Sequence, residues 1–213
     1  MKLILVIAAL VALAACLPSE FQQFSIASVE TSQTDGPSPT PAPIRSTVQG
    51  VDIDVLVNIG KAAWTIVNDN KSVFNYDSDS AYIVPEGITN WTQLEYWSPP
   101  VSVGYKAEWK NELGLHICDF EWALMYTYGG EYNDAGQYLS HVTIEPKHVN
   151  LDWGYSANVQ VTIPADPVNL GSTESPIAGI EIRMVVDFTY LGFDEGSWTY
   201  HWFVQGDGAY QVL

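Results

Sequence analysis

The sequence predicts a mainly β protein, an antiparallel β-sandwich with one N-terminal helix. Three observations point to this fold class. Apolar and polar side chains alternate with a period of two through much of the chain after residue 100, as in strands with one buried and one solvated face. Breaks rich in glycine and proline separate these runs. The chain also has eight tryptophans and twelve tyrosines, which supply large side chains for a core. A β-barrel is the alternative that the same pattern allows.

The N-terminus has the features of an export signal. Lys2 supplies a positive charge, and residues 3–13 form an apolar run that is much shorter than the roughly 20 residues of a membrane-spanning helix. The run ends in Leu13-Ala14-Ala15-Cys16. These residues resemble the lipobox of bacterial lipoproteins, and the resemblance covers residues 1–16 only. It implies that residues 1–15 are a signal peptide and that Cys16 is lipidated and becomes the first mature residue.

A lipidated Cys16 implies localisation in the bacterial cell envelope, with the membrane as a partner through the lipid anchor. Several acyl chains give a stable anchor, because each buried methylene contributes about 0.8 kcal/mol. In the enterobacterial members of the family, aspartate after the cysteine retains the protein at the inner membrane. Leu17 stands there in this chain, so the outer membrane is favoured. The alternative is an ordinary secretory signal cut at Ala12-Leu13-Ala14, which leaves a secreted or periplasmic soluble protein.

Residues 16–49 are predicted to be a lipidated cysteine followed by a disordered tether. Serine, threonine, glutamine and proline dominate this segment, and no structural period persists in it. The composition changes near Val51, so residues 50–213 are predicted to form a single β-rich globular domain.

The net charge of −17 makes nucleic-acid binding unlikely as a function class, because an acidic surface repels phosphate backbones. The chain has two cysteines. If Cys16 is lipidated, Cys118 has no partner for an intrachain disulfide, and the domain must be stabilised by packing.

The N-terminal helix is predicted over residues 52–69. Its apolar side chains recur at helical spacing, and Asp52 or Asp54 can cap its start. Val55, Val57 and Ile59 also alternate as in a strand, but the helical pattern continues past them.

Residues 101–110 and 115–128 are expected to form an antiparallel hairpin. The register that closes it through a loop at 111–114 places Tyr105 opposite Phe120, and the two apolar faces then coincide. The alternating sets lie in 101–109, 118–128, 149–155, 159–163, 180–190 and 198–204. Five tryptophans fall on the inward faces of these runs: Trp109, Trp122, Trp153, Trp198 and Trp202.

No nucleophile elbow, zinc-protease helix, P-loop or dinucleotide fingerprint is present, so no catalytic residue, cofactor or metal site is predicted. Asp119 and Glu121 share a strand face at about 7 Å, within the roughly 5–10 Å that separates glycosidase carboxylates. Two acids on a solvated face are also ordinary in a chain this acidic. An envelope carbohydrate-active hydrolase that uses strand-face carboxylates is therefore the alternative function.

The leading functional hypothesis is a non-enzymatic, lipid-anchored binding or structural module. Loops beside strands can expose aromatic rings that strand faces would bury, and exposed rings can stack on a glycan or an envelope protein. The candidate ligand-binding residues are Trp91 and Trp97, beside a proline-containing turn, and Tyr128 and Tyr132, around a Gly-Gly pair.

Overall fold

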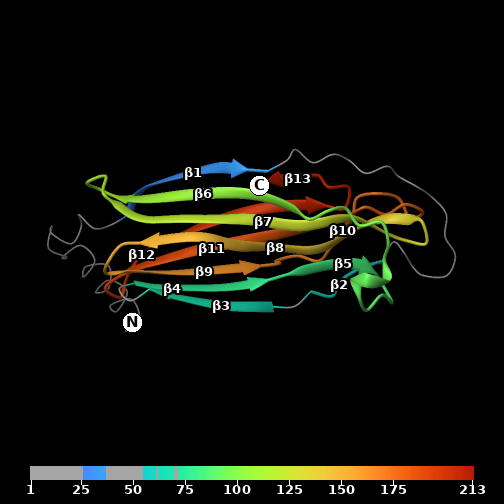
Figure 1. The fold of residues 1–213 in the computed structure, drawn as a ribbon, viewed down its shortest axis with the longest axis horizontal. Coiled ribbons are helices and arrows are strands. Elements are labelled where there is room, and N and C mark those ends of the chain that lie inside the picture. The colour runs from blue at the N-terminus through green and yellow to red at the C-terminus, as the bar shows by residue number, and fades with distance from the viewer. Residues whose placement is uncertain (1–25, 37–54, 61, 70–71) are drawn as a thin grey trace, which may run out of the picture.

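The computed structural model describes residues 26–36, 55–60, 62–69 and 72–213, and these form two stacked sheets (Figure 1). One sheet has the strand order β1-β6-β7-β8-β5-β2, and the other has the order β13-β12-β11-β9-β4-β3, with β10 paired to β11. All pairings are antiparallel except that of β4 with β9. Over the described residues the sheets stay separate and do not close on each other, so the fold is sandwich-like. The strands are β1 (Ile26–Asp35), β2 (Leu56–Asn58), β3 (Ala62–Asp69), β4 (Ser72–Asp79), β5 (Ala81–Pro85), β6 (Val101–Asn111), β7 (His116–Tyr132), β8 (Ala135–Leu151), β9 (Tyr155–Thr162), β10 (Val168–Asn169), β11 (Ala178–Tyr190), β12 (Phe193–Gln205) and β13 (Tyr210–Val212), and a 3-10 turn, η1, spans Trp91–Gln93.

Aromatic side chains fill the space between the sheets. The ring of Trp122 lies 5.2 Å from that of Tyr200 and 6.5 Å from that of Trp202, across the sandwich. Trp109 lies 5.0 Å from Phe188 in the same way. These contacts join β6 and β7 of one sheet to β11 and β12 of the other, as the alternating pattern predicts.

The period-two pattern is confirmed in the central strands. Burial alternates through β6, and the alternating apolar set of β11 is buried throughout: Ile180, Ile182, Met184, Val186, Phe188 and Tyr190. Trp109, Trp122 and Trp202 are fully buried, while Trp198 is half-buried against the core. Cys118 is free and buried in the core, and it is the cysteine for which the sequence predicts no intrachain partner.

The predicted register of the β6–β7 hairpin is wrong by two residues, although its faces are right. Tyr105 lies opposite Trp122 rather than Phe120. One residue of the error comes from the loop, because Asn111 rather than Lys110 bonds to Leu115. The other comes from a shift of the pairing between Trp109 and Lys110, where Ile117 is an extra residue that is buried together with the next one. A bulge of this kind cannot be read from alternation, and a two-residue slip leaves every side chain on its original face.

The predicted helix over 52–69 is wrong for the residues that the structure describes. Residues 56–58 form β2, which pairs with β5, and residues 62–69 form β3, which pairs with β4. The run Thr65-Ile66-Val67 is β-branched, which lowers helix propensity and suits a paired strand. Asp52 and Asp54, the expected caps, lie outside the described residues.

The alternating run predicted over 149–155 is interrupted, and Trp153 is not inward. It is 68% exposed in the turn between β8 and β9. Gly154 makes this turn possible with a φ of 90°, a conformation that favours glycine. The period-two spacing of apolar residues continues across this turn by chance, although the chain there is not a strand.

The predicted disordered tether does not extend over residues 26–35, which form β1 and pair with β6. Ile26 and Val29 pack against the core, and the hydroxyl of Thr31 lies 3.4 Å from that of Tyr200 in the opposite sheet. The polar composition of this strand suits an edge position with one solvated face, so composition alone misassigned it. Residues 16–25 and 37–49 of the predicted tether lie outside the described residues.

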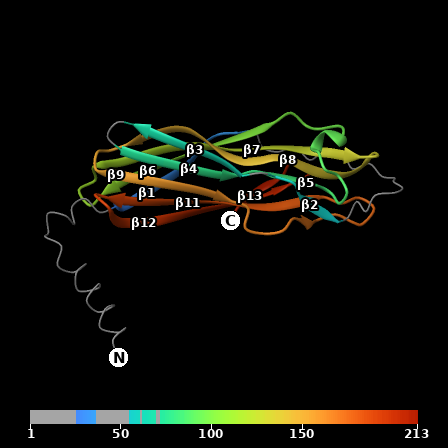
Figure 2. The ribbon, with the colours of Figure 1, turned by 90° about the horizontal axis from the view of Figure 1, so that it is seen from below.

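The two ends of the sandwich differ in the turns that they carry (Figures 1 and 2). Ile26 pairs with Asn111 and Tyr155 pairs with Tyr190, so the start of β1, the β6–β7 loop, the β8–β9 turn and the β11–β12 turn share one end, here called the β1 end. The β7–β8 hairpin, η1 and β10 share the other, here called the η1 end. Within the described part of the chain, no helical segment has the length and apolar composition needed to span a bilayer.

The face assignment of β7 predicts a large difference between two neighbouring variants. Trp122→Ala removes a ring that is 1% exposed and should cost about 3–5 kcal/mol of unfolding free energy. Glu121→Ala removes a half-exposed side chain and should cost less than about 1 kcal/mol. Chemical denaturation of both variants measures the difference. Equal losses of unfolding free energy would show that the face assignment is wrong.

The pairing of β1 predicts that a chain starting at residue 50 is less stable than one starting at residue 25. The eight cross-strand pairs of β1 with β6 contribute roughly 0.2–1 kcal/mol each, so the loss should be about 2–8 kcal/mol. The two chains are compared by urea denaturation. An unchanged midpoint would show that β1 does not contribute to the fold.

Candidate ligand-binding groove

A connection between β5 and β6, residues 86–100, folds beside the outer face of the first sheet at the η1 end. Ile88 and Leu94 are buried and hold it to the core. Asn90 caps η1, because its side chain accepts from the backbone N–H of Thr92 at 3.0 Å, while the Gln93 side chain accepts from the backbone N–H of Asn90 at 3.0 Å. This reciprocal capping box fixes the backbone that carries Trp91.

The second half of the connection runs along the end of β7. Backbone hydrogen bonds of 2.9 Å join Glu95 to Glu131 in both directions, and Ser98 N–H donates to the carbonyl of Tyr128 at 2.9 Å. The indole of Trp97 then lies directly over Gly130. A Cβ built at Gly130 would be 2.4 Å from Cη2 of Trp97, so only glycine allows this approach.

A bulge in β8 presents the third ring. The pairing of β8 shifts between Leu139 and Val142, and His141 in the shifted stretch has a φ of 53°, in the left-handed region. Such a backbone costs energy for a residue with a Cβ and persists only where the surrounding structure holds it. The imidazole Nδ1 is hydrogen-bonded to the hydroxyl of Ser140 at 2.6 Å. Partial desolvation lowers the pKa of His141, which favours the neutral form of the ring.

Four rings from three segments form a continuous series, here called the aromatic groove. The ring of Trp97 lies 6.1 Å from that of Trp91, Trp91 lies 5.0 Å from His141, and His141 lies 4.7 Å from Tyr82. All three contacts are edge-to-face. This geometry leaves part of each ring face available to a ligand.

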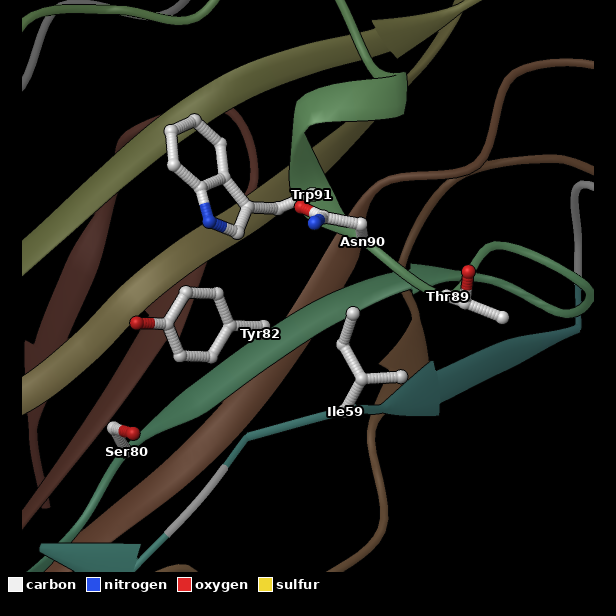
Figure 3. Close-up of a pocket in the computed structure, with 6 residues that line it drawn as sticks. All are labelled: Ile59, Ser80, Tyr82, Thr89, Asn90 and Trp91. Atoms are coloured by element: carbon white, nitrogen blue, oxygen red, sulfur yellow. The ribbon is translucent and has the colours of Figure 1, made fainter.

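Trp91 separates two hollows of the groove. The smaller one, of about 270 Å³, is lined by Ile59, Ser80, Tyr82, Thr89, Asn90 and Trp91. Figure 3 shows the indole of Trp91 and the ring of Tyr82 pointing the same way from η1 and β5. The larger one, of about 410 Å³, lies on the other side of Trp91 and includes Trp97, His141 and Thr143. Both hollows combine aromatic walls with a few polar groups, as small-molecule sites do.

The polar groups around the groove are hydroxyls, amides and one carboxylate. Thr89 and Asn90 line the smaller hollow, and Ser98 and Thr143 line the larger one. The single acid of the lining is Glu145, whose side chain is half-exposed and lies 3.2 Å from Lys147 Nζ. This set can donate to and accept from ligand hydroxyls, and it contains no cluster of cations that would select an anion.

The structure brings two of the four sequence-predicted residues, Trp91 and Trp97, to the groove. Tyr128 and Tyr132 line neither hollow. Both are half-buried and packed against the core, with Tyr128 6.3 Å from the buried ring of Tyr126. The lipidation candidate, Cys16, lies outside the described residues.

Sequence reasoning missed Tyr82 and His141. Tyr82 lies in a short strand whose alternation was not recognised, and His141 reaches the groove only through the β8 bulge. The signal that was available is the spacing Asn90-x-x-Gln93, which is typical of a capped turn and would have fixed the start of η1.

The carboxylates of the alternative function lie elsewhere. Asp119 is engaged by Lys106 Nζ at 3.4 Å and by His116 Nε2 at 3.1 Å. Neither Asp119 nor Glu121 lines either hollow of the aromatic groove. Among the residues that the structure describes, no three histidine, cysteine, aspartate or glutamate side chains are grouped in a way that could hold a metal ion.

Comparisons with protein-family models, with curated proteins and with solved structures found no match to this chain. The geometry of the aromatic groove is therefore the basis for assigning a function.

The contact of Trp97 with Gly130 predicts a strong coupling between the two positions. Gly130→Ala should displace the indole and cost about 1–3 kcal/mol, as overpacking does. In a Trp97→Ala background the same substitution should cost much less, because the clashing ring is gone. A double-mutant cycle by chemical denaturation measures the coupling, and additive losses would show that the ring does not rest on Gly130.

Proposed function

We propose that this protein is a lipid-anchored protein of the bacterial cell envelope that binds an uncharged, hydroxylated ligand in its aromatic groove. The ligand class that fits best is a glycan of the envelope or of the surroundings. The anchor is Cys16, and Leu17 in place of aspartate favours the outer membrane. The proposal is one of binding and not of catalysis.

The observation that carries the binding function is the position of Trp91 between two hollows. A ring that stands between two spaces offers a surface to a ligand on either side, and Trp97 and His141 support it edge-on. Sugar rings have apolar C–H faces and hydroxyl rims. Aromatic walls beside hydroxyl and amide groups are complementary to both features.

The charge of the site favours a neutral ligand. Glu145 is the acid of the larger hollow, and the whole chain carries a net charge of −17. An anionic ligand would be repelled by both. A hydroxyl can instead donate to the Glu145 carboxylate, which makes a charge-assisted hydrogen bond.

The hydrolase alternative has less support. Asp119 is paired with a lysine and lies beside a histidine on the strand face, and it lines neither hollow of the aromatic groove. A glycosidase needs both carboxylates to converge on one bound sugar. Ser140 is hydrogen-bonded to His141, but it is fully buried and cannot reach a ligand as a nucleophile.

Removal of the Trp91 ring should weaken glycan binding strongly without unfolding the protein. A glycan array with the mature chain identifies a binder, and calorimetry with that glycan should show a loss of affinity of about tenfold or more for Trp91→Ala. The matched control is Trp153→Ala, which removes an exposed indole at the β1 end and should bind normally.

Two outcomes would contradict the proposal. Glycan binding that survives in Trp91→Ala would place the site elsewhere. Turnover of a polysaccharide that is lost in Asp119→Asn or Glu121→Gln would instead establish the hydrolase. Thermal melting of each variant separates loss of binding from loss of fold.

A further inference from the structure

The turns at the β1 end carry exposed apolar side chains. Turn positions are ordinarily polar or glycine, yet here three neighbouring connections present large aliphatic and aromatic groups to solvent. Trp153 is 68% exposed and Phe193 is 56% exposed. Together with the exposed leucines of the flanking turns, they form what we call the apolar tip: Leu113, Leu115, Trp153, Leu191 and Phe193.

Backbone hydrogen bonds join these turns into one surface. Asp152 N–H donates to the carbonyl of Ile117 at 2.9 Å, which ties the β8–β9 turn to the start of β7. Leu191 N–H donates to the carbonyl of Gly154 at 2.9 Å, which ties the same turn to the β11–β12 turn. The turns that carry the apolar tip therefore lie together at one end of the sandwich, as the two views of the ribbon also show (Figures 1 and 2).

The backbone of the β11–β12 turn is unusual for the residue that it carries. Leu191 has a φ of 48° and Gly192 a φ of 89°, the pair of left-handed positions found in tight hairpin turns. Asparagine, aspartate or glycine ordinarily takes the first position, because a branched apolar side chain is strained there. Leu191 is nevertheless 53% exposed in this conformation.

The chain reaches this end from the predicted lipid site. Ile26, at the start of β1, pairs with Asn111 beside the β6–β7 loop. Residues 17–25 alone separate Cys16 from Ile26, and nine residues span at most about 30 Å when fully extended. An acylated Cys16 would thus hold the β1 end of the sandwich, and not the η1 end, close to the bilayer.

We propose that the apolar tip docks on the surface of a lipid bilayer and inserts Trp153 and Phe193 among the headgroups. Tryptophan is favoured at this depth because its indole has an apolar body and a polar N–H. The orientation rests on the proposed anchor at Cys16, while the insertion rests on the exposed side chains themselves. The aromatic groove, at the η1 end, then faces away from the membrane and is open to its ligand.

The charges around the tip specify the kind of bilayer. Glu112, Asp152, Asp194 and Glu195 lie in or beside the same turns. Anionic lipid would be repelled by this set, so the docking is apolar and prefers a zwitterionic surface. This distinguishes it from the electrostatic attachment of basic surfaces, which strengthens with anionic lipid.

Vesicle binding of the unlipidated mature chain tests the tip independently of the anchor. The chain from residue 16 with Cys16→Ser is sedimented with phosphatidylcholine vesicles over a range of lipid concentrations. We expect measurable partitioning that falls by about tenfold or more in the double variant Trp153→Ser and Phe193→Ser, because two large apolar side chains are removed. Replacing part of the lipid with phosphatidylglycerol should weaken the binding.

The matched control substitutes two exposed apolar residues at the opposite end, Val168→Ser and Leu170→Ser, and should bind as the parent does. Absence of binding by the parent, equal losses in both double variants, or stronger binding to phosphatidylglycerol would each overturn the proposal. A concentration-dependent dimer that is lost in the tip variant, with no vesicle binding, would overturn it in favour of a contact between two copies.

The mass of the native protein extracted from membranes tests the anchor separately. Acyl chains on Cys16 together with vesicle binding through the tip support both proposals. An unmodified protein whose tip still binds vesicles would overturn the anchor and leave the tip proposal supported. If the native protein is acylated but the unlipidated tip variant binds vesicles as well as its unlipidated parent does, the tip proposal alone is overturned.

Discussion

The packing of aromatic side chains between the two sheets is the interaction on which the rest of the structure depends. Trp122 contacts Tyr200 and Trp202 across the sandwich, and Trp109 contacts Phe188. Each fully buried large side chain contributes about 1.5–3 kcal/mol from the removal of apolar surface from water. Cys118 is free, so it adds no covalent link to this packing. The sheets are rigid because they are packed, and the rigidity fixes where their connecting turns lie.

Because the sandwich is long, the sites at its two ends lie far apart. β7 has 17 residues, which corresponds to a length of roughly 55 Å between its ends. The aromatic groove lies near one end of this strand and the apolar tip lies at the other. A ligand site and a membrane contact can therefore coexist without sharing a residue, and the tether needs no great length to keep the groove away from the bilayer. The same separation explains why Trp91 and Trp153, two exposed or half-exposed indoles, are assigned different partners.

Local irregularities produce both surfaces. The groove requires the left-handed backbone of His141 and the missing side chain of Gly130, and the tip requires the turn at Gly154 and the left-handed backbone of Leu191. Regular strands would have paired His141 into the ladder and continued Trp153 into a buried face. Bulges and turns thus redirect side chains that alternation would otherwise place in the core or on a flat solvated face.

The sequence allowed the strands with the cleanest alternation to be identified, and it failed where the pattern was ambiguous or interrupted. The β11 pattern is unbroken from Ile180 to Tyr190, and every second residue of this stretch is apolar and buried. Residues 62–69 continue the helical spacing of apolar side chains that favoured a helix, yet they pair with β4 and form a strand. The polar composition of β1 predicted a tether, and only the tertiary structure shows that β1 pairs with β6. The partner of Tyr105 was predicted two residues away from its true position, because the loop closes on Asn111 and Leu115, one residue from the predicted pair, and the bulge at Ile117 adds a second residue.

By itself, the sequence determined that the domain is mainly β, which faces of its central strands are buried, and that Trp91 and Trp97 lie outside the regular strands. These properties follow from the two-residue period of a strand and from the turn residues, both of which are local. Only the tertiary structure decided which rings meet at the groove and which turns share an end. Tyr82 and His141 are 59 positions apart and belong to different strands, and Leu113 and Phe193 are 80 positions apart. Contacts over such distances depend on strand order, register and bulges, and these are settled by packing of the whole sandwich rather than by any one segment.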